Sequence, residues 1–492
     1  MEKYLNDMVK SLQKLVSFNS AAGKKAAGAP FGKGVNDALV YTLGLCDGLG
    51  FSVRNMDGYC GYAEIGGGEL FGVLCHLDVV PFNAPDWTHA PLGGEIDGGI
   101  LYGRGTLDDK GPTIAAIYAV KALIDEGFVF GKKVRFIFGL DEEGGKWESI
   151  AYYLDREGMP PCGIAPDADF PVINSEKGKA NYVITAKCRA YPVAEFYAGE
   201  RANIVPDNAY LTIAYGDAIS AAAQGQSPTR KTGGYGIRPD NAPTEQGKSA
   251  GIPVIADTAA AQKQSPNLSA ISAAATEQGL TAEPINGGSM LKISAVGKAA
   301  HGAHPEKGDN AALKLLKLLK SLKLSPYSEL YDALCDCNGK GLGIAFKDDI
   351  SGKLTLNAGI FKKTGIGAPL KIEIDVRYPH NTSKEELISR LKANNPLFSI
   401  RLHSFHKPLY VPESDPLVRT LLTAYDKVTG TKSKPVSIGG ATFARALDYG
   451  VAFGPVFPGA LSSIHEADEN ISLSDLQKTA EIYCEAFREL LK

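Results

Sequence analysis

A chain of 492 residues is too long for one compact core, so two domains are the expectation. Hydrophobic residues make up 44% and charged residues 22%, which is the composition of folded globular proteins and excludes disorder on a large scale. The net charge of −3 arises from interspersed charges of both signs, so we expect no binding to nucleic acid or to a membrane surface. A small molecule is the partner that this composition favours.

The N-terminal segment and the cysteines indicate the compartment. Leu5, Met8, Leu12 and Leu15 follow helical spacing with charges between them, unlike the apolar core of a signal peptide. The sequence contains no run of about 18 apolar residues. The chain is far larger than disulfide-rich secreted scaffolds, so its eight cysteines are interpreted as reduced thiols. These features predict a soluble, cytoplasmic protein.

Residues 1–179 alternate apolar, strand-like runs with helix-like segments. Strands are expected at 71–75 and 134–140, and a helix after Lys110, where Pro112 suits the first turn because a missing N–H costs nothing there. This alternation predicts an α/β fold with a mostly parallel sheet flanked by helices.

The sequence pattern changes over residues 180–382. Short strands at 291–296 and 370–376 flank a helix at 310–323, which predicts a separate α+β unit. Within it, residues 217–288 are rich in Ala, Ser, Gln, Gly and Pro, and surface loops are expected there.

The α/β pattern returns over residues 383–492. Helices are expected near 384–393, 416–428 and 474–491, with a strand at 451–456. The simplest arrangement is a discontinuous α/β domain, made of residues 1–179 and 383–492, into which the α+β unit of residues 180–382 is inserted.

Acidic residues and histidines recur where the expected apolar strands end, which is where α/β sheets place their ligands. Each has an ordinary structural interpretation: a buried core histidine, a solvated turn for adjacent glutamates, or an aspartate at a helix start. Together, two histidines and several carboxylates suit a pair of divalent ions such as zinc, manganese or cobalt. The candidates are His76, Asp78, Asp108, Glu142, Glu143, Asp167 and His465.

The sequence does not match the motifs of nucleotide-binding proteins or of serine hydrolases. Gly103-Arg104-Gly105 continues to Asp108 where a dinucleotide fingerprint requires glycine. The segment ending in Gly247-Lys248-Ser249 has alanine at position 242, where a phosphate loop requires glycine. No GxSxG nucleophile elbow follows an expected strand, because the one match, Gly247 to Gly251, lies in the segment expected to form surface loops.

The motifs HLDVVP, GRGTLDDKGP, DEEGG, PDADFP, GKAAHGAHP, IDVRYP, GGATFARAL and IHEADE occur in this order. Together they resemble the dizinc peptidases related to aminoacylase and carnosinase, in particular the bacterial dipeptidase V-like branch. The resemblance extends from about residue 2 to 490, with no recognisable pattern over 217–288. It implies a catalytic domain with an inserted lid and the activity of a metal-dependent dipeptidase.

Carried over by position, the resemblance implies that Asp108 bridges two ions, most commonly zinc. His76 and Asp167 would complete one ion site, and Glu143 and His465 the other. Glu142 would be the general base. Relatives also have a cis peptide bond after the bridging aspartate, which would lie between Asp108 and Asp109. Asp78 is the expected partner of the second ring nitrogen of His76, since residues two apart on an extended segment face the same side.

The resemblance also implies residues that contact the substrate. His301 would steady the transition state from the lid, Arg377 would bind the terminal carboxylate, and Asn203 would contact the substrate backbone. Gly439 and Gly440 open a turn whose backbone N–H groups could bind the same carboxylate. The structural alternatives are a strand salt bridge for Arg377 and a simple helix entry for the glycines. A lid of this size implies dipeptide substrates and a monomer.

The sequence leaves other functions open. An N-acyl amino acid deacylase or a carboxypeptidase would use the same site on another substrate, and a two-metal phosphoesterase would use the same types of ligand. A binding protein without catalytic activity could retain the fold, although all the candidate ligands and Glu142 are present.

Overall fold

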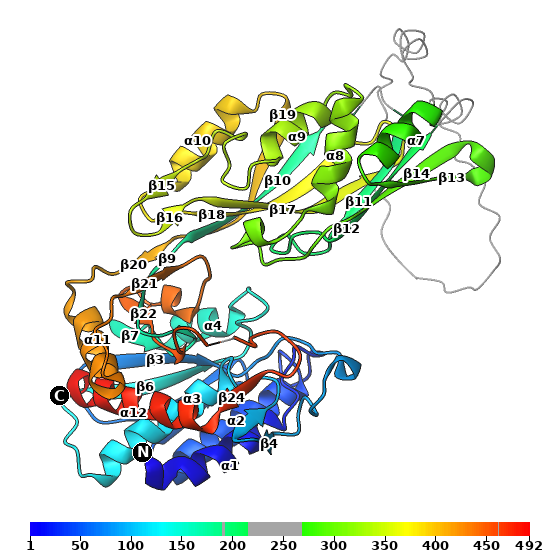
Figure 1. Cartoon of the computed structure of the whole chain (residues 1–492). Coiled ribbons are helices and arrows are strands. Elements are labelled where there is room, and N and C mark those ends of the chain that lie inside the picture. Colours follow the sequence, from blue (N-terminus) through cyan, green and yellow to red (C-terminus); the bar gives the residue numbers. More distant parts are fainter. Residues whose placement is uncertain (189–191, 215–267, 461) are drawn as a thin grey trace, which may run out of the picture. The chain divides into compact units, whose positions relative to one another are not determined.

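The computed structural model describes residues 1–188, 192–214, 268–460 and 462–492. These residues form two compact units (Figure 1). Unit 1 comprises Met1–Gly178, Asp349–Ser351 and Lys407–Lys492, and unit 2 comprises Lys179–Asp348 and Gly352–His406. In sequence, unit 2 is therefore inserted into unit 1.

Two expectations from the sequence differ from the structure. Residues 383–406 were expected in the discontinuous α/β domain. However, α10 (Lys384–Asn394) and β19 (Phe398–His406) belong to unit 2, because β19 pairs with β10 (Gly178–Ala186). Surface loops were expected over residues 217–288, but α7 (Leu268–Glu277) and β13 (Thr281–Ile285) occupy its last part. Residues 217–267 lie outside the described part of the chain.

Unit 1 contains a sheet that is parallel at its centre and antiparallel at its edges. Strand β3 is parallel to β6 and β7, and β22 continues the parallel order next to β7. The expected mostly parallel sheet is confirmed, and the single strand expected at 451–456 is divided into β22 and β23 (Pro455–Val456). The strand order is β1 (Ser52–Met56), β2 (Cys60–Ile65), β6 (Lys133–Gly139), β3 (Leu70–His76), β7 (Cys162–Ala165), β22 (Gly450–Ala452), β9 (Ile173–Glu176) and β20 (Leu409–Tyr410), with β21 (Val436–Ile438) also paired to β9.

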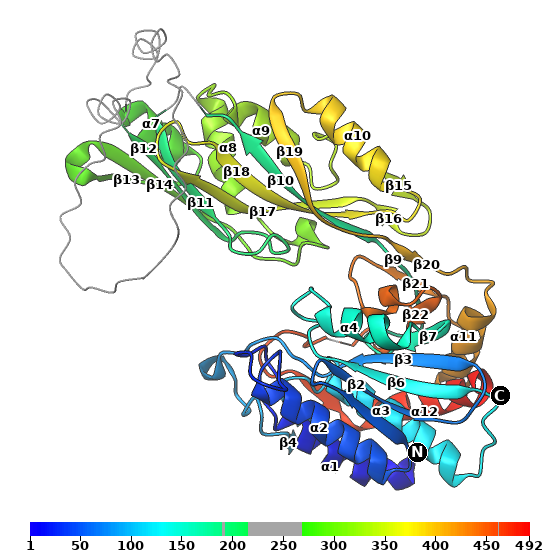
Figure 2. The same cartoon turned by 180° about the vertical axis from the view of Figure 1, so that it is seen from behind.

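The central strands are buried on both faces, which is why they are continuous apolar runs in the sequence. Val73 and Cys75 of β3 pack into the core on one face, and Leu74 packs into the core on the other. Figure 2 shows α1, α2, α3 and α12 on the first face and α4 on the second. The helices are α1 (Leu5–Val16), α2 (Lys33–Gly48), α3 (Lys110–Asp125), α4 (Glu148–Glu157), α11 (Pro416–Thr429) and α12 (Leu473–Leu490).

Unit 2 contains a second sheet, with α7 to α10 on one face (Figure 1). Residues 180, 182, 184 and 186 of β10 are buried while the residues between them are partly exposed, the alternation of a sheet with one covered face. This unit also contains β11 (Val193–Ala198), β12 (Asn208–Ala214), β14 (Met290–Val296), β15 (Lys347–Asp348), β16 (Gly352–Lys353), β17 (Thr355–Thr364), β18 (Leu370–Tyr378), α8 (Ala311–Ser321) and α9 (Tyr327–Leu334).

Local sequence explains where α8 begins. The Asn310 side chain accepts hydrogen bonds from the backbone N–H groups of Ala312 and Leu313, which have no partner within the helix. Its amide donates to the carbonyl of Ala358 on β17, so the cap also fixes the helix to the sheet.

Among the helices of the described residues, none combines the length and apolar character that crossing a bilayer requires.

Candidate metal centre

The parallel centre of the unit 1 sheet gathers the candidate ligands. Strands β3, β6 and β7 run in the same direction, so their carboxyl ends lie at one edge. His76 is the last residue of β3, Glu142 and Glu143 follow β6, and Asp167 follows β7. Three segments that are distant in sequence thus meet because of the strand order.

Two loops supply the remaining candidates. Asp108 lies in the turn before α3, and the peptide bond between Asp108 and Asp109 is cis, as the resemblance implies. His465 lies between β23 and β24 (Asn470–Ser472), in the left-handed region of backbone conformation with φ of 65°.

The five candidate ligands form two groups that share Asp108. His76, Asp108 and Asp167 form what we call the buried group, and Asp108, Glu143 and His465 form the open group. In the buried group, Nε2 of His76 lies 2.9 Å from Oδ1 of Asp108 and 3.7 Å from Oδ2 of Asp167. In the open group, Nε2 of His465 lies 3.1 Å from Oδ2 of Asp108 and 3.0 Å from Oε1 of Glu143.

These separations fit divalent ions. Two atoms each about 2.1 Å from a tetrahedral zinc ion are about 3.4 Å apart, and the observed separations lie close to this value. Imidazole nitrogens and carboxylate oxygens are the ligands that zinc, manganese and cobalt accept. One oxygen of Asp108 faces each group, which is the arrangement that a bridging carboxylate requires.

Burial and neighbouring charges shift the pKa values of residues in both groups. Burial, and then the charge of Asp108, raises the pKa of Asp167 to about 7. Burial would lower the pKa of His465, but contact with Asp108 and Glu143 raises it to about 10. Burial would likewise lower the pKa of His76, yet the surrounding carboxylates raise it well above its usual value. Protons on these residues therefore offset the negative charge of the carboxylates. This is the behaviour expected of a site that would bind cations.

Glu142 lies beside the cluster and belongs to neither group among the described residues. Burial, and then the charge of Asp167, raises its pKa well above the ordinary value of a glutamate. A carboxylate that is close to the ligands but not part of either group is free to exchange a proton.

Asp78 contacts the cluster differently from the expectation. Nδ1 of His76 lies within hydrogen-bond distance of the backbone carbonyl oxygen of Asp78, at 2.9 Å, while Oδ1 of the Asp78 carboxylate lies 3.6 Å away. The carboxylate accepts hydrogen bonds from the backbone N–H groups of Glu142, at 3.1 Å, and Glu143, at 3.0 Å. Asp78 thus orients the imidazole through its main chain and the two glutamates through its side chain.

Several residues that were not among the candidates from the sequence shape the cluster. Asp141 accepts hydrogen bonds from the N–H groups of Glu148 and Ser149 and thereby caps α4, although it lies in the same acidic motif as Glu142. Oδ2 of Asp109 accepts from the backbone N–H of His76 at 3.1 Å. Glu469 and Arg104 form a buried ion pair at 2.6 Å. All four lie in quoted motifs, but a motif does not show where a side chain points.

The segment containing Gly439 and Gly440 lies beside the buried group. The ring of Phe443 packs edge-on against His76, with centroids 6.2 Å apart. The carboxylate of Glu176, which is fully buried, accepts a hydrogen bond from the N–H of Thr442 and one of 2.6 Å from Nε of Arg445. The expected helix after the glycines is the short 3₁₀ helix Phe443–Ala446.

The three candidates of unit 2 occupy two places within that unit. Ile204 and His301 form an isolated β-bridge, and the N–H of Gly302 donates to the carbonyl of Asn203, so Asn203 and His301 lie on adjacent segments. Arg377 lies on β18 and is only 3% exposed. Its Nε donates to Oδ1 of Asp375 at 2.5 Å and its Nη2 to Oδ2 at 3.3 Å, which is the salt bridge weighed as its structural alternative.

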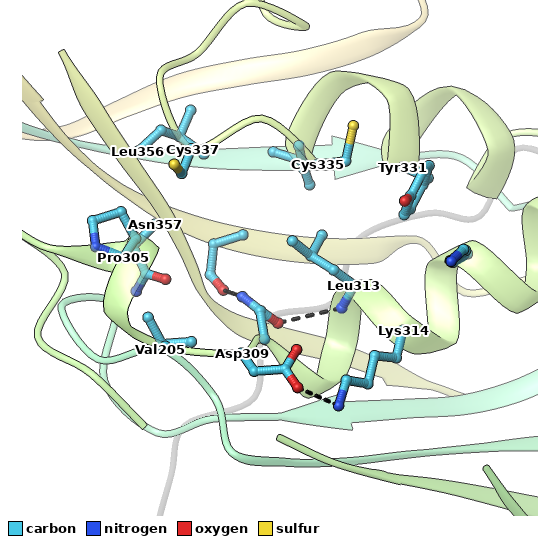
Figure 3. Close-up of a pocket in the computed structure, with 15 residues that line it drawn as sticks. Val205, Pro305, Asp309, Leu313, Lys314, Tyr331, Cys335, Cys337, Leu356 and Asn357 are labelled. Atoms are coloured by element: carbon cyan, nitrogen blue, oxygen red, sulfur yellow. Dashed lines mark hydrogen bonds and ion pairs between the residues drawn. The ribbon is translucent and has the colours of Figure 1, made fainter. Parts of the chain in front are cut away.

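A separate pocket of about 310 Å³ lies within unit 2, lined in part by Leu313, Lys314 and Tyr331 (Figure 3). Its wall includes Asn357, whose amide donates to the carbonyls of Ala202 and Ile204, on either side of Asn203. None of the residues that line it belongs to the buried or the open group.

The comparisons define the class of the protein. The profile of peptidase family M20/M25/M40 matches residues 72–489, and the chain belongs to this family. The chain is 35% identical over 502 residues to the putative dipeptidase YtjP of Bacillus subtilis (strain 168), covering 99% of this chain and 97% of that protein.

Two solved structures have the same fold at low identity. Human carnosine dipeptidase 1 is 14% identical with a TM-score of 0.54, covering 100% of this chain and 97% of that chain. Aminopeptidase PepT from Bacillus cereus ATCC 10987 is 15% identical with a TM-score of 0.55, covering 99% of both chains. The catalytic domain with an inserted domain is therefore the architecture of this chain as well.

Proposed function

We propose that this protein is a metal-dependent dipeptidase that uses two ions held by the buried and open groups. The observation that carries the proposal is that one carboxylate, Asp108, faces both groups while Glu142 lies beside them and in neither. The names of the relatives, a putative dipeptidase and a carnosine dipeptidase, support a dipeptide as the substrate. Zinc is the proposed metal, with manganese or cobalt as alternatives that the same ligands accept.

Two bound ions would polarise the scissile carbonyl and favour deprotonation of the attacking water. Glu142 takes the proton of that water and returns it to the departing amine. Asp78 holds the main chain of Glu142 and Glu143 in place through its two hydrogen bonds, which keeps the base and a ligand in fixed relation. Its carbonyl holds Nδ1 of His76, so that Nε2 is presented to the ion.

Unit 2 is proposed to act as the lid. Its adjacent segments at Asn203 and His301 would supply hydrogen-bond donors to the substrate and to the developing oxyanion. Asp375 holds the guanidinium plane of Arg377, the proposed contact of the substrate carboxylate. Gly439 and Gly440 are proposed to contact the same carboxylate from unit 1. The monomeric state and the cytoplasmic location stay predictions.

Hydrolysis of a panel of substrates tests the proposal. The protein is stripped of metal, reconstituted with zinc, manganese or cobalt, and assayed on free dipeptides, N-acetylated amino acids, longer peptides and phosphate esters. A dipeptidase cleaves the free dipeptides best and loses activity when the amino end is blocked. Preference for N-acetylated amino acids would identify a deacylase, and no hydrolysis with any ion would leave a binding protein.

A further inference from the structure

Glu469 is a fully buried carboxylate that accepts four hydrogen bonds from one loop. Its Oε1 accepts from the backbone N–H groups of Leu107, at 2.9 Å, and Asp108, at 3.1 Å. Its Oε2 accepts from the backbone N–H of Gly105, at 3.0 Å, and from Nη1 of Arg104, at 2.6 Å. The main chain of the shared ligand Asp108 is thus bonded directly to this carboxylate.

The conformation of the loop follows from this arrangement. Three N–H groups can point at one carboxylate only if the chain curves around it, and Gly105 does so with φ of 91°, a value that side chains disfavour. A Cβ at Gly105 would also approach the Lys110 side chain to 2.9 Å. The loop is therefore a concave anion site that a carboxylate of the same chain occupies.

The same ion pair fastens the loop to the segment that carries His465. Nη2 of Arg104 donates to the backbone carbonyl of His465 at 3.4 Å, and the N–H of Gly103 donates to the carbonyl of Glu469 at 2.8 Å. The aromatic ring of Trp87 lies 5.1 Å from the Arg104 guanidinium. Asp108 and His465 are distant in sequence, and these contacts join their segments at several points.

We propose that Glu469 is a positioning residue for the ion centre, acting through the main chain of Asp108 and, by way of Arg104, through that of His465. The inference rests on the proposed function only in its ion-binding part. Glu469 belongs to neither the buried nor the open group, and its carboxylate accepts hydrogen bonds from the loop. Glu469 fixes the positions of one Asp108 oxygen and of the His465 imidazole. The open group therefore depends more on Glu469 than the buried group does.

Glu469→Gln tests the proposal because it keeps the size of the side chain and replaces one acceptor oxygen by an N–H₂ group that faces donors. The metal-free full-length variant is titrated with Zn²⁺ alone against a chelating indicator. We expect its apparent affinity for Zn²⁺ to fall about 10–100-fold, the usual effect of losing a residue that holds a ligand in place. Binding at the open group should weaken more than binding at the buried group.

Glu176→Gln is the matched control. Glu176 is equally buried in unit 1, is paired with Arg445, and accepts from the N–H and hydroxyl of Thr442, but it bonds to no residue of either group. Both variants should lower the temperature of unfolding, and only Glu469→Gln should weaken Zn²⁺ binding. Equal losses of folded stability with wild-type Zn²⁺ affinity in both variants would overturn the proposal, because Glu469 would then be a structural residue only.

Arg104→Lys decides the question if Glu469→Gln does not fold. Lysine keeps the charge next to Glu469 but lacks the second nitrogen that reaches the carbonyl of His465. A decrease of about tenfold in Zn²⁺ affinity is expected, and an unchanged affinity would refute the proposal.

If the wild-type protein binds two ions but hydrolyses no dipeptide, the proposed function fails and this inference stands. If it hydrolyses dipeptides while both variants bind Zn²⁺ normally, only the inference fails.

Discussion

The buried and open groups share one aspartate but differ in how the fold presents them. The His76 side chain is 1% exposed and ends a central strand, whereas the His465 side chain is 49% exposed and lies in a loop. Each group nevertheless contains one imidazole and two carboxylates. The difference teaches that the proposed two-ion centre would combine a group positioned by a central strand of the sheet with a more exposed group positioned by a loop. Asp108, in contact with both histidines, couples the two halves.

Removing the shared ligand should have the largest effect and would show whether the two groups depend on each other. In Asp108→Ala, both groups lose an oxygen ligand, so we expect loss of both ions and a fall of hydrolysis to the uncatalysed rate. Metal content measured by mass spectrometry, with circular dichroism to check folding, tests this. Retention of one tightly bound ion would show that the groups are independent.

Removing the proposed base should separate chemistry from ion binding. Glu142→Gln leaves the ligands of both groups intact, so we expect kcat to fall about 10²–10⁴-fold while two ions remain bound. Steady-state kinetics and metal analysis on the same preparation measure the two quantities. A loss of metal that parallels the loss of activity would instead make Glu142 a ligand.

Single substitutions of the two histidines compare the groups directly. His76→Ala leaves buried carboxylates without their partner, so we expect the metal-free protein to lose about 3–5 kcal/mol of folding free energy. His465→Ala removes a half-exposed partner, and the expected loss is below about 1 kcal/mol. Urea unfolding of both variants measures the free energies. Equal losses would show that exposure does not distinguish the two groups.

The pH dependence of ion binding provides a further test, because the proposed ligands must release protons when they bind an ion. His465, with a pKa of about 10, carries a proton at neutral pH in the metal-free protein, and Asp167, with a pKa of about 7, carries one part of the time. Ligands must lose these protons to bind an ion, so the apparent affinity should rise with pH by up to about tenfold per pH unit for each proton, as far as about pH 7 for Asp167 and about pH 10 for His465. Calorimetry in buffers of different ionisation enthalpy counts the protons. A binding enthalpy that is the same in every buffer would contradict this prediction.

The sequence predicted the parts of the fold that local patterns determine. Apolar runs located β3 and β6, Pro112 located the first turn of α3, and the ends of strands located His76, Glu143 and Asp167. Histidine and carboxylate positions after strands were informative because a parallel sheet gathers its carboxyl ends at one edge. The roles of these residues as ligands and base stay predictions.

Features that depend on long-range pairing could not be predicted in the same way. The local sequence of α10 does not show to which unit this helix belongs, and the pairing of the following strand β19 with β10 assigns both elements to unit 2. The carboxylate of Asp78 has the spacing to reach His76, yet the turn after β6 brings two backbone N–H groups closer to it. Glu469 follows His465 by four positions, but its partners lie in a loop far away in the chain.

The left-handed backbone conformation at His465 restricts which residue types this position can accept. With φ of 65°, any residue other than glycine is disfavoured there by about 1–2 kcal/mol, and asparagine is penalised least among the others. A library randomised at position 465 and screened only for resistance to heat should therefore enrich glycine and asparagine. The same library screened for growth on a peptide nutrient should return histidine, because selection for turnover opposes the backbone preference at this one residue.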